Sequence, residues 1–377
     1  MRLPPGMAGP HGRPDGSLAS LRPAAGAAVR DLNPGYFALV MATGIVSRAV
    51  GGDGSARLSG ILLALTIACY AVLVVAYGWR LIGYRSEFLA DLANPRKTFA
   101  FFTFVAASDV LGSRLAADGH TWATVVLLIA AIAAWLLLNY GVPLMLITRH
   151  GTQSALAGAN GTWFIWVVGT QSIAVSATVL PKPVPTWLVA LAVTCWSVGV
   201  VLYVMVAALV LVSLLQYPVR PAEVTPAYWV FMGATAISVL AGAQILLLPA
   251  DPLVTAARPV IAGICVILWA FGTWLIPFLL AAGVWRHLIR KVKLSYEPGL
   301  WSIVFPVGMY GVASRELGKA LHVSWLATFG GDEGWLAFAV WAVVFVAMLG
   351  SFAARWMRDP ARHPADGVGT DSIGRPG

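Results

Sequence analysis

The sequence predicts an all-α integral membrane protein. Of its 377 residues, 59% are hydrophobic and only 11% are charged, a balance that is unusual for a soluble domain. Apolar stretches of about 17 to 30 residues recur along the chain, and each is long enough, as a helix, to cross a hydrocarbon core about 30 Å thick. The chain shows no alternating apolar and polar pattern of strand length, so a membrane β-barrel is not expected.

Ten transmembrane helices in five hairpins are expected. The apolar segments cover residues 34–50, 58–80, 98–116, 121–147, 161–180, 186–215, 226–249, 258–285, 298–320 and 335–357. Of the 25 Lys and Arg residues, 18 lie in the two tails or beside the loops that follow even-numbered helices. Because basic residues accumulate on the cytoplasmic side of a membrane, both ends of the chain are expected there.

The two ends of the chain differ from the rest in composition. Residues 1–32 are rich in Pro, Gly, Ala and Arg and contain no apolar run, so we expect a disordered cytoplasmic tail. Residues 358–377 are expected to form a second such tail. Residues 33–357 remain as one ten-helix transmembrane transport domain in an inner or plasma membrane.

Several classes of function are disfavoured. The net charge of +9 comes from basic residues at helix ends, such as Arg286, Arg290, Lys291 and Lys293, where they set orientation and contact lipid headgroups; nucleic-acid binding is not expected. The three Cys lie in apolar segments without CxxC spacing, and the six His are scattered, so neither a metal nor a cofactor is expected. Nucleotide-binding and hydrolase motifs do not occur.

The odd-numbered helices share a repeat at their N-terminal ends. The runs PGYFALVMATGI from Pro34, PAYWVFMGATAI from Pro226 and PGLWSIVFPVGM from Pro298 align, and the runs from Thr98 and Thr162 match more loosely. Hairpins that repeat in one orientation are expected to form a quasi-five-fold ring. The odd helices are rich in small residues and the even ones in Leu, Val and Ile, so odd helices are expected inside, around a pore, and even helices outside.

Matched positions in this ring predict a hydrophobic gate that closes by steric block and dewetting. The matched apolar residues are Met41, Phe104, Val168, Gly233 and Phe305. Pro306 follows Phe305 inside a helix, where a proline removes a hydrogen bond and kinks the backbone. The alternative is that these residues are ordinary packing between helices.

Two positions further along, three hydroxyls stand at matched places: Thr43, Thr170 and Thr235. Hydroxyl groups can donate hydrogen bonds to an anion without adding a buried charge. The alternative is that each hydroxyl bonds to a carbonyl of its own helix about one turn earlier.

Ionisable residues inside the spans are further candidates, because charges are costly in a bilayer. They include Arg48, Asp109, Arg114, Arg315 and Glu316. The arginines would raise the local concentration of anions near the non-cytoplasmic mouth, unless they only reach to headgroups or Arg315 pairs with Glu316. Asp109 is expected to pair with Arg48 or Arg114; the alternative is a carboxyl that takes up a proton during transport.

The runs PGYFALVMATGIVS and PGLWSIVFPVG resemble segments of the tellurite-resistance and dicarboxylate transporter family, which includes malate permeases, sulfite exporters and plant slow-type anion channels. The resemblance covers residues 33 to 357. It implies a homotrimer whose subunits each contain a central pore, lined by the five odd helices and blocked by a Phe beside a Pro kink; the matching residue here is Phe305. Leu300 and Trp301 stand where the family usually has an aromatic pair.

The sequence therefore predicts a transporter of small anions and not an enzyme. Chloride, nitrate, sulfite, tellurite and C4-dicarboxylates all fit this class, through an anion channel or a proton-coupled carrier that uses Asp109. A membrane-embedded enzyme would need convergent acid, base or metal groups, and only Asp109, Arg315 and Glu316 are available for that role. A scaffold without transport would have no need of matched layers.

Overall fold

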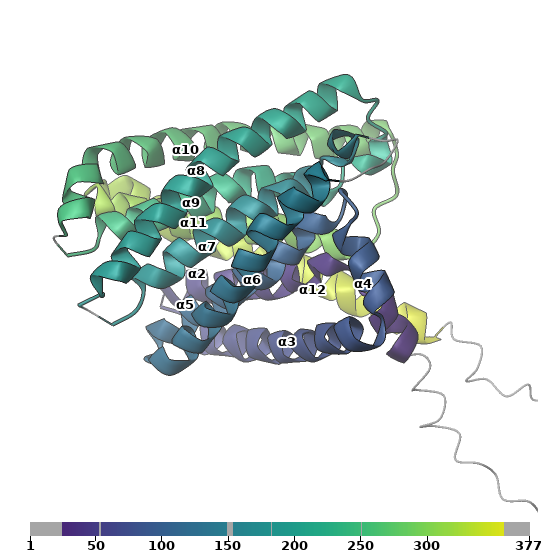
Figure 1. Cartoon of the computed structure of the whole chain (residues 1–377), viewed down its shortest axis with the longest axis horizontal. Helices are drawn as coiled ribbons and strands as arrows, with labels where there is room; N and C mark the ends of the chain where they lie inside the picture. The colour runs from purple at the N-terminus through teal and green to yellow at the C-terminus, as the bar shows by residue number, and fades with distance from the viewer. Residues whose placement is uncertain (1–24, 53, 149–153, 182, 250, 358–377) are drawn as a thin grey trace, which may run out of the picture.

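The computed structural model describes residues 25–52, 54–148, 154–181, 183–249 and 251–357. These residues contain helices and no strand, which confirms the all-α class (Figure 1). The long helices follow one another as five hairpins: α2 (Ala38–Gly52) and α3 (Ala56–Gly83), α5 (Phe102–Ala117) and α6 (Thr121–Ile147), α7 (Phe164–Thr178) and α8 (Thr186–Gln216), α9 (Val230–Leu246) and α10 (Pro252–Val284), and α11 (Trp301–Ala320) and α12 (Ser324–Met357).

The first helix of each hairpin packs against the first helices of two other hairpins. Contacts run from α2 to α5, from α5 to α7, from α7 to α9, from α9 to α11, and from α11 back to α2. Of the most apolar stretches, 72–89% of the residues are buried in α2, α5 and α9, against 17–33% in α3, α6, α8, α10 and α12. The second helices therefore lie outside and present bulky apolar side chains to lipid.

Each inner helix begins with a short 3₁₀ turn. The turns span Pro34–Phe37, Thr98–Phe101, Gly161–Trp163, Pro226–Trp229 and Pro298–Leu300. Three of them start with proline, whose fixed φ and lack of an N–H group suit the first turn of a helix. The turns contact one another in the same cyclic order as the helices that they begin.

Eight helices are long and apolar enough to cross a membrane within the described ranges. The two inner helices α7, with 15 residues, and α11, which carries Arg315, Glu316 and Lys319, are not among the eight. Both are buried along most of their length, and a helix that is shielded from lipid does not need a uniformly apolar surface. The count of ten spans stays a prediction.

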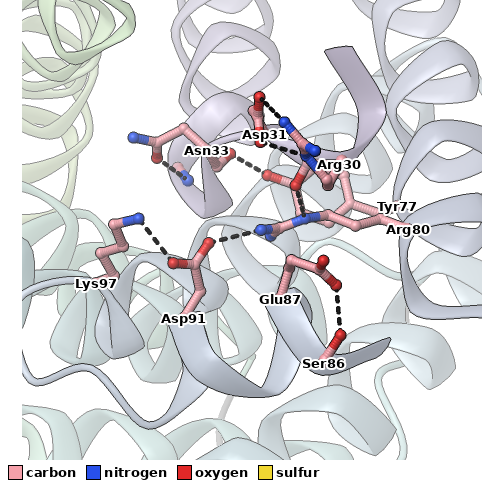
Figure 2. Close-up of polar contacts among 10 residues, drawn as sticks. Arg30, Asp31, Asn33, Tyr77, Arg80, Ser86, Glu87, Asp91 and Lys97 are labelled. Carbon is pink, nitrogen blue, oxygen red and sulfur yellow. Dashed lines mark hydrogen bonds and ion pairs between the residues drawn. The ribbon is translucent and has the colours of Figure 1, made fainter. Parts of the chain in front are cut away.

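Residues 25–30, which lie in the tail expected to be disordered, are helical. The guanidinium of the buried Arg80 donates from Nε to the Arg30 carbonyl at 3.1 Å and from Nη2 to Asp91 Oδ2 at 2.7 Å. Lys97 contacts the other Asp91 oxygen at 2.7 Å, and Tyr77 donates to the Asn33 carbonyl. Figure 2 shows how these contacts join the end of α3, the short helix α4 (Arg85–Leu92) and the chain before α2. The tail at residues 358–377 lies outside the described residues.

The last helix begins eleven residues before the predicted start at residue 335. Ser324–Gly334 contains three glycines and two carboxylates, a composition that does not predict a span. In the structure, a side chain added at Gly330 would overlap the backbone of α11, and Gly311 and Gly318 leave matching space on α11. These glycines let α11 and α12 approach closely, so tertiary packing outweighs the unfavourable helix propensity of glycine.

The cyclic contact of the 3₁₀ turns gives a stability prediction at Gly161. A Cβ at this position would overlap the backbone of Ala227 and Tyr228 in the neighbouring turn, whereas a Cβ at Gly299 would meet only Pro226 at 3.9 Å and Glu297 at 4.0 Å. We expect Gly161→Ala to cost about 1–3 kcal/mol, as overpacking does, and to lower the thermal unfolding temperature of the purified protein. Gly299→Ala is the control and should leave that temperature nearly unchanged; equal effects would contradict the tight contact.

Candidate functional site

A hollow of about 860 Å³ lies where the five inner helices begin. We call it the vestibule. Each inner helix or its 3₁₀ turn contributes to its lining, with Gly35 and Ala38 before and in α2, Ala100 and Thr103 at α5, Thr162 and Ile165 at α7, Ala227 and Tyr228 before α9, and Gly299 and Ser302 at α11. The positive ends of five helix dipoles therefore point toward one hollow, which favours negative charge there.

Polar side chains from the preceding loops fix these first turns. Asn33 accepts a hydrogen bond from the backbone N–H of Gly35 at 2.8 Å, and Asn160 accepts one from Thr162 at 2.8 Å. Each asparagine thereby satisfies an otherwise unpaired donor. Both asparagines line the vestibule, so the residues that cap the helices also form its wall.

One ion pair crosses the vestibule wall between two loops. Arg96 Nη1 lies 3.1 Å from Glu223 Oε1, and both residues line the vestibule. The backbone N–H of Arg220 and the guanidinium of Arg96 lower the pKa of Glu223, so its carboxylate stays ionised at neutral pH and offsets the charge of Arg96. Because both side chains are well exposed, the pair contributes little stability.

A second, smaller cavity lies deeper between the same five helices. Its volume of about 10 Å³ is close to the least that holds one water molecule. It is lined by Ile45 and Arg48 of α2, Asp109, Val110 and Ser113 of α5, Ser172 and Val175 of α7, Ile237 and Leu240 of α9, and Met309 of α11. We call it the inner cavity.

Buried side chains lie between the lining residues of the two hollows. On α11, Ser302 lines the vestibule and Met309 lines the inner cavity, and Phe305 lies about one turn from each. Phe305 is 1% exposed and lines neither hollow. Met41 of α2 and Val168 of α7 occupy the corresponding places and are buried to a similar degree.

Gly233 of α9 lies beside the proline that follows Phe305. A Cβ on Gly233 would approach Pro306 Cγ to 2.8 Å, closer than real side chains pack. The glycine therefore lets the part of α11 that contains Pro306 lie directly against α9.

Phe104 faces a different way from the other members of its predicted layer. Its ring centroid lies 5.3 Å from that of Phe37 and 6.3 Å from that of Tyr70 on the outer helix α3. Ala106, which is fully buried, lies between Thr103 of the vestibule and Asp109 of the inner cavity. In α5, the small Ala106 therefore takes the place in the layer that the repeat gave to Phe104.

The hydroxyls of the three matched threonines are engaged outside the two hollows. Thr43 donates to the Leu39 carbonyl at 2.8 Å and accepts from the indole N–H of Trp341 on α12 at 3.0 Å. Thr170 donates to the Trp166 carbonyl at 3.0 Å and accepts from the indole N–H of Trp135 on α6 at 2.9 Å. Thr235 donates to the Met232 carbonyl and lies against Gly272 on α10. These contacts fit the alternative in which the hydroxyls bond to their own helices.

Asp109 is a buried carboxylate in the wall of the inner cavity. Its Oδ2 accepts a hydrogen bond from Ser172 at 2.8 Å, while Oδ1 has no hydrogen-bond partner within the described ranges. Ser176 donates to the backbone carbonyl of Asp109 at 3.2 Å. No ion pair of the described residues involves Asp109, so the pairing with Arg48 or Arg114 expected from the sequence is not found.

Arg114 is held instead by a polar cluster between α2, α3 and α5. Its guanidinium donates to Ser47 at 3.2 Å and to Ser59 at 2.9 Å, and it pairs with Asp118 at 2.6 Å. The two serines also bond to each other's backbone carbonyls. This arginine therefore ties three helices together.

The other charged candidates lie, like Arg114, toward the C-terminal ends of the inner helices. Arg48 lines the inner cavity. Glu316 pairs with Lys319 at 2.8 Å, and the guanidinium of Arg315 lies directly against Gly52 at the end of α2. Within the described ranges, no group of three His, Cys, Asp or Glu side chains is arranged to hold a metal ion.

Several lining residues were not among the sequence candidates. Ser302, Met309 and Ile45 each lie three or four residues from a predicted gate residue, and Ser172 lies four from Val168. Steps of three or four residues from Phe305, Met41 and Val168, instead of two, would have selected them.

Comparison with known proteins gives a consistent result. Residues 31–349 match the family model described as voltage-dependent anion channel, SLAC1. A 171-residue stretch is 50% identical to an uncharacterized membrane protein of Mycobacterium tuberculosis H37Rv and covers 45% of this chain and 87% of that protein. An uncharacterized transporter of Methanocaldococcus jannaschii is 25% identical over 84% of this chain and 92% of its own length. A sulfite efflux pump of Arthroderma otae is 22% identical over 84% of this chain and 90% of its own length. The family model covers most of the sequence, and the chain therefore belongs to the SLAC1 family of voltage-dependent anion channels.

Proposed function

We propose that this protein moves small anions across a cell membrane through a pore between α2, α5, α7, α9 and α11. The observation that carries the proposal is that the vestibule and the inner cavity are each lined by all five of these helices or their first turns. The closed cycle of helix contacts supports a ring around this path. Eight helices, among them α2, α5 and α9, are long and apolar enough to span a membrane within the described ranges. The proposal adds α7 and α11, which gives ten spans.

Anions are favoured over cations by the charges along the path. Five helix N-termini point at the vestibule and make the local potential there more positive. Arg48 does the same in the inner cavity when the carboxyl of Asp109, which lines the same cavity, is protonated. In the proposed orientation the vestibule opens to the cytoplasm. The first described helix and the end of α12 lie at one end of the bundle (Figure 1), as an even number of spans requires.

Phe305 is the proposed gate. The ring fills the layer between the two hollows together with Met41, Val168 and the small residues Ala106 and Gly233. Pro306 has no N–H group, so the Ser302 carbonyl lacks its usual helical hydrogen bond and α11 is weakened one turn from the ring. A small rotation of α11 at this point would move the ring out of the path.

The gate proposal predicts the behaviour of Phe305→Ala. Removal of the ring opens the layer between the hollows, so we expect the anion conductance of the purified protein in lipid bilayers to rise severalfold or more. Phe104→Ala is the matched control, because Phe104 has the same ring in the same predicted layer but packs toward α3. This variant should conduct like the unmodified protein.

Two results would defeat the gate assignment. One is an unchanged conductance in Phe305→Ala, provided that the variant elutes as a monodisperse protein. The other is an equal increase in Phe104→Ala, which would show that general loosening of the bundle is enough. A current selective for cations would contradict the proposed substrate class.

The substrate is proposed to be a small inorganic or organic anion. One relative is a sulfite efflux pump, so sulfite is a reasonable first candidate, beside tellurite, chloride, nitrate and C4-dicarboxylates. The inner cavity has space for about one water molecule in this conformation, so passage of any of these anions requires the helices to move apart. A homotrimer with one pore in each subunit is part of the proposal and rests on family membership.

A second mechanism is favoured by Asp109. A buried carboxylate with an unpaired oxygen in an anion path repels the substrate when ionised, but can donate a hydrogen bond to it when protonated. Proton uptake by Asp109 would then accompany anion binding, as in a proton-coupled carrier. Arg48 is the other ionisable side chain in the lining of this cavity.

The carrier mechanism predicts that Asp109→Asn abolishes proton-driven uptake. In proteoliposomes with an imposed pH gradient, anion uptake by the unmodified protein should rise with the gradient, and uptake by the variant should not respond to it, since the amide cannot exchange a proton. Asp118→Asn, at the end of the same helix and outside the cavity lining, is the control and should keep the response. A channel would instead conduct without any gradient in all three proteins.

A further inference from the structure

A second kind of pocket lies at the outside of the bundle, where α10 ends and α9 and α11 begin. It has a volume of about 420 Å³. Its walls are largely apolar and include Trp229, Leu280, Leu294 and Ile303. The adjacent outward face of α10 and of the turn that follows it carries Leu280, Val284 and Leu288, which are exposed by 55%, 49% and 71%. The pocket is therefore accessible from the side that the proposed membrane covers.

One buried cation in this pocket lacks a full set of partners. Arg286 is only 9% exposed, and its Nε has no hydrogen-bond partner in the described part of the chain. Its Nη2 lies 3.5 Å from Glu297 Oε1, longer than the roughly 2.7–2.9 Å of a charge-assisted hydrogen bond. Buried donors are nearly always paired, so this guanidinium is suited to an additional oxygen ligand. Lys293 and His287 also line the pocket.

Arg286 lies in an unusual stretch of backbone. Residues Trp285–Ile289 form a π-helical turn at the end of α10, and such turns are rare and often found at functional sites. The chain then reverses at Lys291, whose φ of 52° is uncommon for a residue other than glycine. Arg290 lies 5.3 Å over the ring of Trp285, and neither Arg290 nor Lys291 lines the pocket.

We propose that this pocket binds an anionic phospholipid, with the lipid phosphate on Arg286 and Lys293 and an acyl chain along Leu280 and Ile303. The phosphate supplies the oxygen acceptors that the guanidinium lacks, and guanidinium groups bind phosphate with good geometry. The apolar walls and the outward-facing side of α10 select a lipid over free phosphate, which has nothing to place against them. In the proposed orientation this end faces the cytoplasmic leaflet, where anionic lipids accumulate.

The site also contacts the helix that carries the proposed gate. Leu300 and Ile303 form part of its wall and lie five and two residues before Phe305. A lipid held here touches the first turn of α11, so its binding and release are coupled to the position of that turn. Binding itself requires only that the protein lies in a membrane, and it can be measured without any transport.

The test measures lipid binding to the full-length protein in detergent by native mass spectrometry. The probes are phosphatidylglycerol, zwitterionic phosphatidylcholine and inorganic phosphate. We expect phosphatidylglycerol to bind preferentially and Arg286→Gln to weaken it about tenfold or more, the scale of a lost charge-assisted hydrogen bond. Arg290→Gln is the matched control: it removes the same charge four residues away, outside the pocket lining.

A second variant leaves every charge in place. Gly283 lines the pocket, and a Cβ there would meet no atom within 4 Å, so Gly283→Leu fills pocket space without disturbing the helix. We expect it to weaken phosphatidylglycerol binding as well. Gly263→Leu on the same helix is its control, since a Cβ there also meets no atom and the position is outside the lining.

Three outcomes would overturn the proposal. Equal losses in Arg286→Gln and Arg290→Gln, with no effect of Gly283→Leu, would show unspecific attraction to basic residues. Equal binding of the two lipids would remove the role of the anionic headgroup. Full displacement of phosphatidylglycerol by inorganic phosphate at similar concentration would show that the site binds a free anion. Since no readout here depends on flux, failure of this proposal is distinct from failure of the proposed pore.

Discussion

The mutual contact of the five inner helices is the constraint on which the rest of the structure depends. Each inner helix packs against two others, and the 3₁₀ turns at the start of these helices contact one another in the same cyclic order. A chain that crossed the membrane with isolated helices would have no reason to place small residues at these interfaces, because lipid accommodates bulky side chains equally well. Gly161, Gly233 and the glycines between α11 and α12 allow the close approach, and the hollows lie along the interior that this packing creates.

Packing also explains why the inner and outer helices carry different side chains. The outer helices bring aliphatic side chains to lipid and, on their inward faces, indole N–H groups that satisfy inner hydroxyls, as Trp341 does for Thr43 and Trp135 for Thr170. Some buried polar atoms of the described inner helices have no hydrogen-bond partner, at Gln171 in α7 and at the wall of the inner cavity. Asp109 is the clearest case, with one carboxylate oxygen unpaired. In the proposed pore, this oxygen is available to an anion or a proton.

The sequence predicts the helical class and the hairpin order, because composition, basic residues and the repeat are all local signals. The gate layer of Met41, Val168 and Phe305 stays a prediction. The pore-lining role of Thr43, Thr170 and Thr235 also stays a prediction, but their contacts lie toward the outer helices for a geometric reason. Residues two apart on a helix point about 200° away from each other, so if Met41 faces the interior, Thr43 faces the outer helix. Phe104 and Ala106 are exchanged by the same rule. The partner of Asp109, the early start of α12 and the pocket at Arg286 depend on contacts between distant segments, which a single sequence does not contain.

The most direct test of the central claim asks whether the Phe305 layer separates two compartments. In a protein whose native Cys69, Cys195 and Cys265 are replaced by serine, Ser302→Cys probes the vestibule and Met309→Cys probes the inner cavity. A small charged thiol reagent applied from the vestibule side should label Ser302→Cys, leave Met309→Cys unlabelled, and label Met309→Cys once Phe305→Ala is added. Labelling of Met309→Cys with the ring in place, or continued protection after its removal, would contradict the account.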